Sequence, residues 1–596
     1  MERTIQTYAL DELPLLYTII KSLGIGNSVD EYIKVHGNWT GALPGTILEL
    51  WLCYFLSECD HRLSGTEEWA KNNLDLLRLL SGNKGLSIQD FSDDKLGTLL
   101  DYFSEDAYWS SIETAINSKV LGVYRLTDLA EGADLATFRL DAAPMQGYGK
   151  VKENGLLQYG YHKHHANLPQ FKLKLCTLDN SVNHFAYPIC HLTVNGKVAD
   201  DELYTAIIEE SKKVLNGVPT LTSGNLYVGD SKFGSLNNRL AVHKNLDYYL
   251  MPLSKVQLTT KERKILIDNS KSSKSSSYEQ VFKKEQGEKV LVAEGFEVYQ
   301  NIEVDRENGI YQWTERRLFV HSVNYAKSQC TALEKRLSKA SNSISELTER
   351  KQGKAILSTK EGYETAIAAI LQVQKIENLL AVEVIEHQTK IKKRAYGNRP
   401  ERVEINTSFE LIITREENAI EQRKKYMGWQ VYATNAPQSL LTFEKCVWKY
   451  RYQSNIESRF DDIRNKMAPL LPVFLQKENR IQGLVNILLL ALKVCSILEY
   501  KVAKELQDRK EVLRGIYEGN PKRGTDCPSA KRILTAFKGI SMSVILEKGK
   551  FQFALMTDLK LVQQKILTLL DLNDTVYTDL IAKIELFFSD SIIIET

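Results

Sequence analysis

The sequence predicts an α/β protein in which a mixed sheet with flanking helices is interrupted by a long insertion and bordered by helical regions. Three observations predict it. Residues 1–125 and 481–506 carry apolar residues at helical spacing. Short β-type segments, one helix and further strands follow one another from residue 136. From about residue 257 to 430 this regularity lapses over a stretch too long for a connecting loop, which indicates an insertion with structure of its own.

The N-terminal region predicts a small helical bundle. Apolar residues at 15, 16, 19 and 20 form one face, and Pro14 suits the first turn of that helix. Ile47–Leu56 is apolar nearly all round, which is typical of a helix at the centre of a bundle. No catalytic grouping is visible here, so we expect this region to pack or to bind a partner.

The middle region predicts a sheet with two aspartates at strand ends. The expected strand 136–140 (ATFRL) runs into Asp141, and the short strand 226–229 (LYVG) ends on Asp230. Aspartate at such a place is most often a turn or helix-cap residue, so a structural role also explains each one alone. The other expected elements are strands at 156–161, 171–178, 187–194 and 246–253 and a helix at 201–215.

The insertion begins with a Lys/Ser-rich stretch, 261–277, which predicts a flexible basic loop. Strand-like segments within 279–325 and an amphipathic helix at 333–347 follow it. A basic cluster comes next, formed by Lys390, Lys392, Lys393, Arg394, Arg399 and Arg402. The last expected elements are a strand at 409–414, a charged helix around 423–425 and a strand at 429–433.

The stretch Cys446–Lys466 (CVWKYRYQSNIESRFDDIRNK) contains no Gly or Pro and predicts one uninterrupted helix. Tyr450, Gln453, Glu457 and Arg464 stand at relative positions 0, 3, 7 and 14, which places them on one stripe of that helix. A solvated face with ion pairs is the simplest interpretation of this stripe. The alternative is that Glu457 is a metal ligand that meets carboxylates from far upstream.

Composition limits the partners and the compartment. The net charge is only +2, so a nucleic-acid partner would have to be bound by local basic patches. The eight cysteines form no CxxC or Cys/His cluster, which favours reduced thiols and no structural zinc site. The first residues, MERTIQTYALDELP, are unlike a signal peptide, and the apolar run Ile487–Leu498 is short and contains Lys493. We therefore expect a soluble intracellular protein with a buried core helix at 487–498.

Asp141, Asp230 and Glu457 together are the ligands and catalytic residues that a two-metal phosphoryl-transfer site requires. Two Mg²⁺ ions, for which Mn²⁺ substitutes, need hard oxygen ligands, and three carboxylates supply them. One ion activates the attacking water or 3′-hydroxyl, and the other stabilises the leaving oxygen. Because the three acids are far apart in the sequence, their spacing alone is a weak signal, and the segments around them carry the rest.

Those segments resemble the catalytic core of bacterial DDE transposases. The chain is similar in particular to insertion-sequence transposases of the IS-four-related group, in its IS-sixteen-thirty-four-like branch. Residues 1–125 also resemble the helical N-terminal domain of that branch, through DHRLSGTEEW and DFSDDKLG. The core segments are RLDAAPMQGY (139–148), GLLQYGYHKHHANLPQFKLKL (155–175), LYVGDSKFGSLNNR (226–239), YYLMPLS (248–254), GWQVYATNAP (428–437) and YRYQSNIESRFDDIRNK (450–466).

The resemblance implies an RNase H-like core whose acidic triad is Asp141, Asp230 and Glu457. It implies a cut-and-paste transposase that binds terminal inverted repeats, nicks double-stranded DNA with magnesium and transfers the 3′-hydroxyl to target DNA. A homodimer in the DNA complex and a cytoplasmic, nucleoid-associated location are implied as well. By the same resemblance, Tyr450 would hydrogen-bond a phosphate near the cut end, and Arg464 would hold backbone phosphate in place of a lysine.

Five regions are expected on this basis. They are a helical N-terminal domain that is expected to bind DNA (1–125), the first part of an RNase H-like core (126–256), an insertion domain (257–430), the second part of the core with the Glu helix (431–506) and a helical C-terminal region (507–596).

Two departures from the family pattern are present. Gln453 stands where the family has an arginine, which removes a charge expected to contact phosphate. Ala142 and Ala143 follow the first aspartate where hydroxyl residues are more common. Asp461, one turn after Glu457, is a rival third ligand.

We expect further residues to contact DNA. Trp313 has basic neighbours and would stack on an unpaired base, although a core position is the simpler interpretation for it and for Trp429. The histidines at 162, 164 and 165 are interpreted as surface residues near DNA rather than metal ligands. The expected phosphate contacts, beside Tyr450, Gln453 and Arg464, are Lys232, Lys392, Lys393 and Arg394.

Two other functions stay open. One is a transposase relic that binds DNA without catalysis. The other is an RNase H-like nuclease that cuts nucleic acid without strand transfer.

Overall fold

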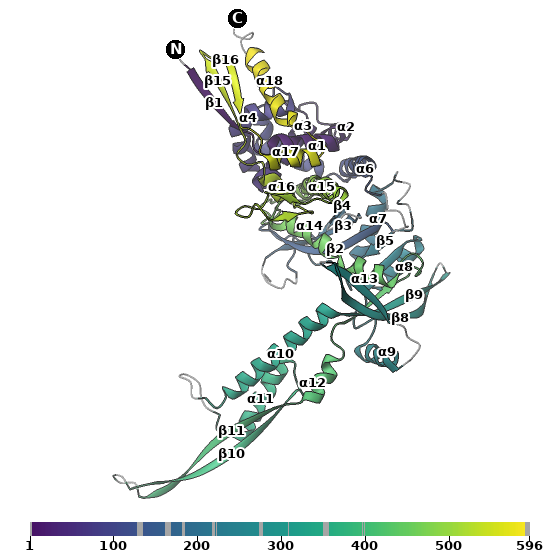
Figure 1. Cartoon of the computed structure of the whole chain (residues 1–596), viewed down its shortest axis with the longest axis vertical. Coiled ribbons are helices and arrows are strands. Elements are labelled where there is room, and N and C mark those ends of the chain that lie inside the picture. The colour runs from purple at the N-terminus through teal and green to yellow at the C-terminus, as the bar shows by residue number, and fades with distance from the viewer. Residues whose placement is uncertain are drawn as a thin grey trace. The chain divides into compact units, whose positions relative to one another are not determined.

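The computed structural model describes residues 3–127, 135–160, 168–180, 185–216, 218, 221, 223–272, 278–285, 287–307, 309–349, 357–395, 397 and 400–590. The chain forms two compact units (Figure 1). The first comprises Met1–Pro252, Asn301–Glu315 and Thr434–Thr596, and the second comprises Leu253–Gln300 and Arg316–Ala433. The histidines at 162, 164 and 165 and Arg399 lie outside the described residues.

The N-terminal part of the first unit is a helical bundle, as predicted. Its central helix, α3, is buried on all sides because every residue from Ile47 to Leu56 is apolar or, like Glu49, held by partners inside the bundle. Gly24 ends α1 in the left-handed conformation, at φ 71°, and donates its N–H to Lys21 O at 3.0 Å. The helices are α1 (Leu13–Leu23), α2 (Ile25–Tyr32), α3 (Pro44–Glu58), α4 (Leu63–Ser81), α5 (Asp93–Phe103) and α6 (Asp106–Val123), with a 3-10 turn at Ile88–Phe91.

A mixed sheet follows in the first unit, in the order β4-β3-β2-β5-β6. Strands β2, β3 and β4 are antiparallel, whereas β2, β5 and β6 are parallel. Helices contact the sheet, with α7 against β3 and β4 and α14 against β2. The elements are β2 (Thr137–Gln146), β3 (Gln170–Leu178), β4 (Tyr187–Asn195), α7 (Leu203–Val214), β5 (Leu226–Val228), α8 (Leu236–Lys244) and β6 (Tyr248–Pro252). This confirms an α/β fold with a mixed sheet and flanking helices.

The expected strand at 156–161 is absent from the described part of that range, where Gln158 makes a single bridge to Gln170. The strand expected at 136–140 is longer than predicted and continues to Gln146. The other expected strands and the helix of this region are present with small shifts of their ends.

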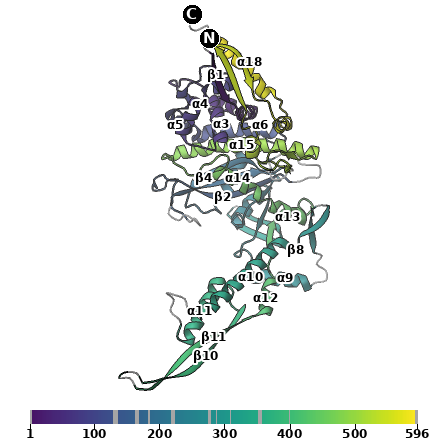
Figure 2. The same cartoon turned by 60° about the vertical axis from the view of Figure 1, so that its left-hand side comes forward.

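Helix α15 (Glu478–Arg509) crosses the first unit between the N-terminal helices and the sheet (Figure 2). It contacts α5, α3 and β4, and its apolar run is buried, as expected for 487–498. It is the only helix of the described residues that is long and apolar enough to cross a membrane by length and composition. Since 94% of its most apolar window is buried inside the protein, the helix is compatible with the core of a soluble protein.

The C-terminal region differs from the helical expectation. A hairpin of β15 (Ser541–Glu547) and β16 (Lys550–Met556) pairs with β1 (Arg3–Ala9) in a three-stranded sheet, so the two ends of the chain meet. Such pairing between distant segments leaves little trace in local periodicity. The remaining elements are β13 (Leu513–Arg514), β14 (Gly524–Thr525), α16 (Ala530–Thr535), α17 (Leu561–Leu569) and α18 (Thr575–Asp590).

The second unit contains strands in the order β12-β9-β8-β7, a separate β10-β11 hairpin and four helices among its described residues. The loop expected at 261–277 is wrong for 261–272, which lie in α9; the buried Ile267 anchors this helix in an apolar cluster with Phe296 and Trp429. The elements are α9 (Thr260–Ser272), β7 (Glu279–Glu285), β8 (Glu288–Arg306), β9 (Gly309–Ser322), α10 (Val323–Ser345), α11 (Lys360–Gln374), β10 (Leu380–Lys393), β11 (Arg402–Arg415), α12 (Glu417–Lys424) and β12 (Trp429–Thr434).

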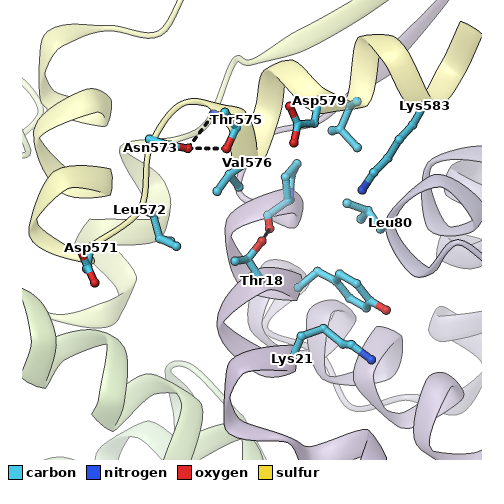
Figure 3. Close-up of a pocket in the computed structure, with 13 residues that line it drawn as sticks. Thr18, Lys21, Leu80, Asp571, Leu572, Asn573, Thr575, Val576, Asp579 and Lys583 are labelled. Carbon is cyan, nitrogen blue, oxygen red and sulfur yellow. Dashed lines mark hydrogen bonds between the residues drawn. The ribbon is translucent and has the colours of Figure 1, made fainter. Parts of the chain in front are cut away.

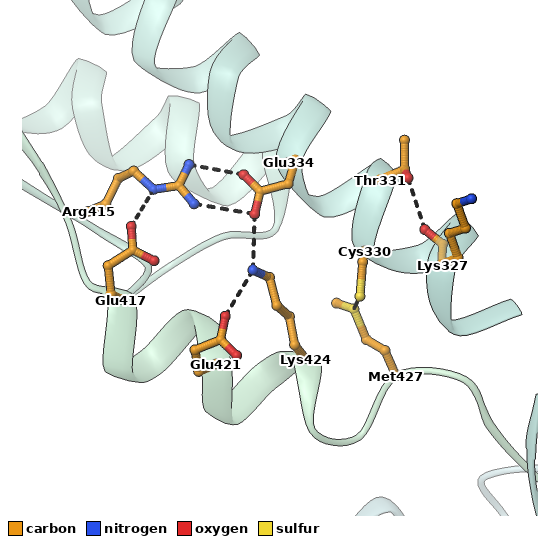
Figure 4. A network of polar contacts seen from close by, with 9 residues as sticks. All are labelled: Lys327, Cys330, Thr331, Glu334, Arg415, Glu417, Glu421, Lys424 and Met427. Carbon is orange, nitrogen blue, oxygen red and sulfur yellow. Dashed lines mark hydrogen bonds and ion pairs between the residues drawn. The ribbon is translucent and has the colours of Figure 1, made fainter. Parts of the chain in front are cut away.

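An ion-pair network joins α10, β11 and α12 (Figure 4). Both oxygens of Glu334 accept hydrogen bonds from Arg415, at 3.0 and 3.2 Å, and Lys424 approaches Glu334 at 3.3 Å. Arg415 also pairs with Glu417 and Lys424 with Glu421. The network holds the base of the hairpin against the helices.

Candidate active site

Asp141 and Asp230 lie at one edge of the parallel part of the sheet. Arg139 of β2 is paired with Val228 of β5, and each aspartate follows two residues later along its own chain segment. Because parallel strands run in one direction, this register brings the two side chains to the same region. The expected strand exit is correct for Asp230 but wrong for Asp141, since β2 continues to Gln146 and pairs Asp141 with Leu175 of β3.

The charges of Asp230 and Glu457 both act on Asp141. Burial, as the largest cause, and the charges of the two neighbouring carboxylates together raise the pKa of Asp141 to about 6. The backbone N–H of Ala142, which donates to Oδ1 of Asp141 at 2.8 Å, and the charge of Lys174 oppose this rise. The three acids predicted from the sequence therefore share one electrostatic environment.

Tyr204 of α7 holds Asp230 and was not foreseen from the sequence. Its hydroxyl donates to Oδ1 of Asp230 at 2.5 Å, and the N–H of Lys232 donates to the same oxygen at 3.0 Å. The ring of Tyr204 stacks on Phe233, with 4.8 Å between ring centroids. Tyr204 and Asp230 are 26 residues apart in the sequence, so only the packing of α7 on the sheet could reveal the pair.

Lys174 of β3 is a second residue that sequence reasoning missed. Its side chain is fully buried, its Nζ lies 2.8 Å from the centroid of the Tyr204 ring, and it has no hydrogen-bond partner among the described residues. Burial lowers the pKa of Lys174 to about 7, against the opposing charges of Asp230, Asp141 and Asp200. A buried amine thus sits among the carboxylates and offsets part of their mutual repulsion.

The single helix expected at Cys446–Lys466 is wrong. The stretch forms α13 (Phe443–Arg451) and α14 (Ser454–Asn465), separated by a turn at Tyr452 and Gln453. In the turn, Gln453 N–H donates to Tyr450 O at 3.2 Å and Asn455 N–H to Tyr452 O at 2.9 Å, so three-residue bonds replace the four-residue bonds of an α-helix. The four predicted residues consequently do not share one continuous helical stripe.

Tertiary contacts fix α14 after this turn. The guanidinium of Arg459 is buried and donates to Glu499 at 2.7 Å and to Ser496 at 3.2 Å, both on α15. Asn455, also buried, donates from Nδ2 to Phe185 O at 3.2 Å. These bonds satisfy polar groups that would otherwise be costly to bury, and they offset the loss of helical hydrogen bonds at the turn.

Tyr450 and Glu457 remain close to the aspartates despite the break. Burial, as the largest cause, and the charges of Asp230, Asp141 and Glu457 together raise the pKa of Tyr450 to about 12. Glu457 is exposed and lies in the first turn of α14. The rival Asp461 is also exposed and pairs with Lys466 at 3.2 Å. Of the two acids, Glu457 is the one whose charge is felt at Asp141 and Tyr450.

The other predicted residues are placed as follows. Gln453 is half-buried, and its Oε1 has no hydrogen-bond partner among the described residues. Arg464 is half-buried beside the ring of Phe460. The ammonium group of Lys232 pairs with Asp200. Lys392, Lys393 and Arg394 are exposed at the far end of the β10-β11 hairpin in the second unit.

Trp313 is a core residue rather than an exposed stacking surface. Its ring is 8% exposed, packs with Leu240 and Val304, and stacks on His243 at 4.9 Å between centroids. Its indole N–H donates to Tyr249 Oη at 2.9 Å. This placement contradicts the expected base contact, because stacking on DNA would require the ring to leave its cluster. Trp429 is likewise buried.

The donor set suits magnesium, because Asp141, Asp230 and Glu457 offer hard carboxylate oxygens within one electrostatic environment. Both hydrogen bonds to Asp230 fall on Oδ1. Across the described ranges, no three His, Cys, Asp or Glu side chains are close enough together to form a ready-made metal site. The chemistry of the three carboxylates therefore fits magnesium, but the described side chains do not form a preassembled metal site.

A cavity of about 660 Å³ lies elsewhere in the first unit, between α1, α18 and the residues that lead into α18 (Figure 3). Thr18, Lys21, Asn573, Asp579 and Lys583 are among its lining residues. None of the acids or their partners described above lines it.

Comparison with known proteins does not assign this site to a family. No protein-family model matches the chain, and no curated protein matches it either.

Proposed function

We propose that this chain is a DDE transposase with an RNase H-like core, which binds the terminal inverted repeats of its element and cuts and joins double-stranded DNA. The observation that carries the proposal is the effect of Asp230 and Glu457 on Asp141, since these acids come from three distant segments. Paired carboxylates at the edge of parallel strands, joined by an acid on a later helix, suit two-metal phosphoryl transfer. The segments that resemble the transposase family contain all three acids.

Asp141, Asp230 and Glu457 would hold the magnesium ions, which would supply Lewis acidity at the scissile phosphate. The chain's own residues orient these ligands. Tyr204 and the backbone N–H of Lys232 fix the position of Asp230 Oδ1, and the N–H of Ala142 binds Oδ1 of Asp141. The hydroxyl of Tyr450 is protonated at neutral pH, so it can donate a hydrogen bond to a phosphate oxygen.

The test uses the full chain and DNA taken from both sides of the coding frame, where the proposal places the inverted repeats. Asp230→Asn and Glu457→Gln should bind this DNA like the unmodified protein but lose magnesium-dependent cleavage by about 100-fold or more. Manganese should replace magnesium in the unmodified protein. Cleavage at the unmodified rate by either variant would show that the acid assignment is wrong.

Asp461→Asn is the matched control, since Asp461 is an exposed acid on the same helix as Glu457. It should cleave normally. If Asp461→Asn loses cleavage while Glu457→Gln retains it, Asp461 is the third ligand instead.

The same reaction separates the other two functions. A relic would shift the DNA without nicking it, and a nuclease would produce cleaved ends but never joined products. Joined products that contain the 3′ end of the element support the transposase, and a dimer is expected in the complex with paired ends.

A further inference from the structure

The β10-β11 hairpin extends beyond the helices that support its base. Its register has fourteen paired positions, from Leu380 with Arg415 to Lys393 with Arg402. At the base, Val384 is buried with Tyr363 and Ile367 of α11. Figure 1 shows the two strands continuing past α10 and α11. We call residues 388–393 and 402–407 the distal ribbon.

The distal ribbon is exposed on both faces. Every residue of its first strand is exposed, and in its second strand only Glu404 is partly covered. Three large apolar side chains lie in water, with exposed fractions of 43% for Ile391, 54% for Val403 and 58% for Ile405. A two-stranded ribbon with no covered face is marginally stable alone, so this segment is built to meet a partner.

The two faces of the distal ribbon differ in charge. Paired residues of an antiparallel ladder point to the same side, so Lys390, Lys392, Val403 and Ile405 share one face, which we call the lysine face. Neither lysine of this face makes an ion pair with the part of the chain that the structure describes. The lysine face therefore presents two free cations next to two exposed aliphatic side chains.

The opposite face is neutralised by one acid. Glu404 pairs with Lys393 at 2.5 Å and with Arg402 at 2.7 Å. Two of the cations in the basic cluster are thus already occupied, including Lys393, which was expected to bind phosphate.

We propose that the distal ribbon enters a groove of duplex DNA, with Lys390 and Lys392 of the lysine face on the phosphate backbone. The choice of duplex DNA rests on the proposed function. Two strands about 5 Å apart fit the major groove, which is about 12 Å wide and admits a two-stranded ribbon. Free lysines favour the phosphates, and Val403 and Ile405 offer the apolar contact that thymine methyl groups take.

A membrane surface fits this ribbon less well. Docking on a bilayer would place Lys390 and Lys392 on the same face as the side chains to be inserted, and it needs a broader apolar surface than two residues.

The experiment measures binding of full-length protein to a fluorescent 30-base-pair duplex of arbitrary sequence, without magnesium, over a series of salt concentrations. Lys390→Gln with Lys392→Gln should weaken binding and reduce the slope of log affinity against log salt by about 1.8, which is two phosphate contacts. Glu404→Gln frees Lys393 and Arg402, so it should tighten binding and steepen that slope.

Lys284→Gln with Lys289→Gln is the matched control. These exposed lysines face each other across the β7-β8 ladder of the same unit, so the control makes the same charge change on another two-stranded segment. It should leave the slope nearly unchanged. Thermal unfolding of each variant verifies that the fold is intact.

Three outcomes would overturn the proposal. The first is an unchanged salt slope in the Lys390/Lys392 variant. The second is an equal loss of DNA affinity in the Lys284/Lys289 control. The third is that the Lys390/Lys392 variant loses binding to phosphatidylserine vesicles but keeps its full affinity for DNA. The proposed function fails separately, because it depends on cleavage by the acids. If the Lys390/Lys392 substitutions leave DNA binding unchanged and the protein still cleaves DNA, only this inference is wrong. If they weaken DNA binding as expected but the protein does not cleave DNA, only the enzymatic proposal is wrong.

Discussion

The hydroxyl of Tyr204 donates a 2.5 Å hydrogen bond to Oδ1 of Asp230, while Lys174 lies over the ring of the same tyrosine. Tyr204 thus links a candidate metal ligand to a buried amine. The tyrosine comes from α7 and the lysine from β3, so the sheet and its covering helix both determine the position of the carboxylate.

Tyr204→Phe should slow magnesium-dependent cleavage about tenfold or more without unfolding the protein. A hydrogen bond to a charged group contributes about 1.5–3 kcal/mol, and its loss frees Asp230 to leave the orientation that the tyrosine holds. The phenyl ring retains the stacking on Phe233. Cleavage rates over a magnesium titration measure the effect.

Tyr227→Phe provides the comparison for that variant, because the hydroxyl of Tyr227 is also buried but contacts Ser211 at 3.4 Å. It should cleave at the unmodified rate. Equal losses in the two variants would mean that Tyr204 acts through general packing and not through Asp230.

Gln453→Arg should strengthen DNA binding and raise the salt slope by about 1, because it adds a cation next to Tyr450 and Glu457. Gln453 is half-buried in the turn before α14, and its Oε1 has no hydrogen-bond partner among the described residues. Replacing the side chain therefore removes no hydrogen bond made by that oxygen. Anisotropy titrations at several salt concentrations measure the change. No change in either DNA affinity or cleavage would show that position 453 does not contact DNA.

Lys493→Met should reduce the free energy of unfolding by about 3–5 kcal/mol, the usual loss when one partner of a buried ion pair is removed. Lys493 Nζ donates to Asn117 Oδ1, Pro188 O and Ile189 O at 2.6–2.9 Å and lies 3.7 Å from Glu113. Urea unfolding measures the loss.

A second substitution tests the cause of that loss. Glu113→Leu combined with Lys493→Met should recover part of the stability, since no unpaired carboxylate is then left inside. Lys501→Met, on the same helix but only half-buried and bonded to Leu570 O, should cost about 1 kcal/mol. Strictly additive losses for Glu113→Leu and Lys493→Met would show that the two charges do not interact.

Stability should fall in mild acid because of His191. Burial, reinforced by the charge of Lys493, lowers the pKa of His191 to about 3 from an ordinary value near 6.5. Between these values the unfolded chain binds a proton that the folded protein does not, so folding stability drops as pH falls, by about 2 kcal/mol at pH 5 from this residue. His191→Phe should lose that much less stability than the unmodified protein between pH 7.5 and pH 5, as measured by urea unfolding. The same loss in both proteins would assign the acid sensitivity to other groups.

Much of the first unit follows from local pattern. Helices such as α7 and strands such as β5 and β6 appear within a few residues of where periodicity places them, because alternating or helical burial leaves a direct mark on neighbouring residues. The position of Asp230 just after β5 was visible for the same reason, whereas the continuation of β2 past Asp141 was not. The convergence of the two aspartates depends on the register of Arg139 with Val228, which no local pattern contains.

The sequence by itself determined the α/β order of elements, the buried α15 and the three acids of the candidate site. Tertiary structure alone decided the turn at Gln453, the partners Tyr204 and Lys174, and the pairing of β1 with β15. The physical reason is the separation of the interacting residues along the chain. Periodicity indicates which side of a single element is buried. Hydrogen bonds and charge interactions between segments hundreds of residues apart depend on how those elements pack. Arg459 shows the difference. Its charge suggests an exposed helix face, but in the structure it is buried and paired with Glu499 of α15.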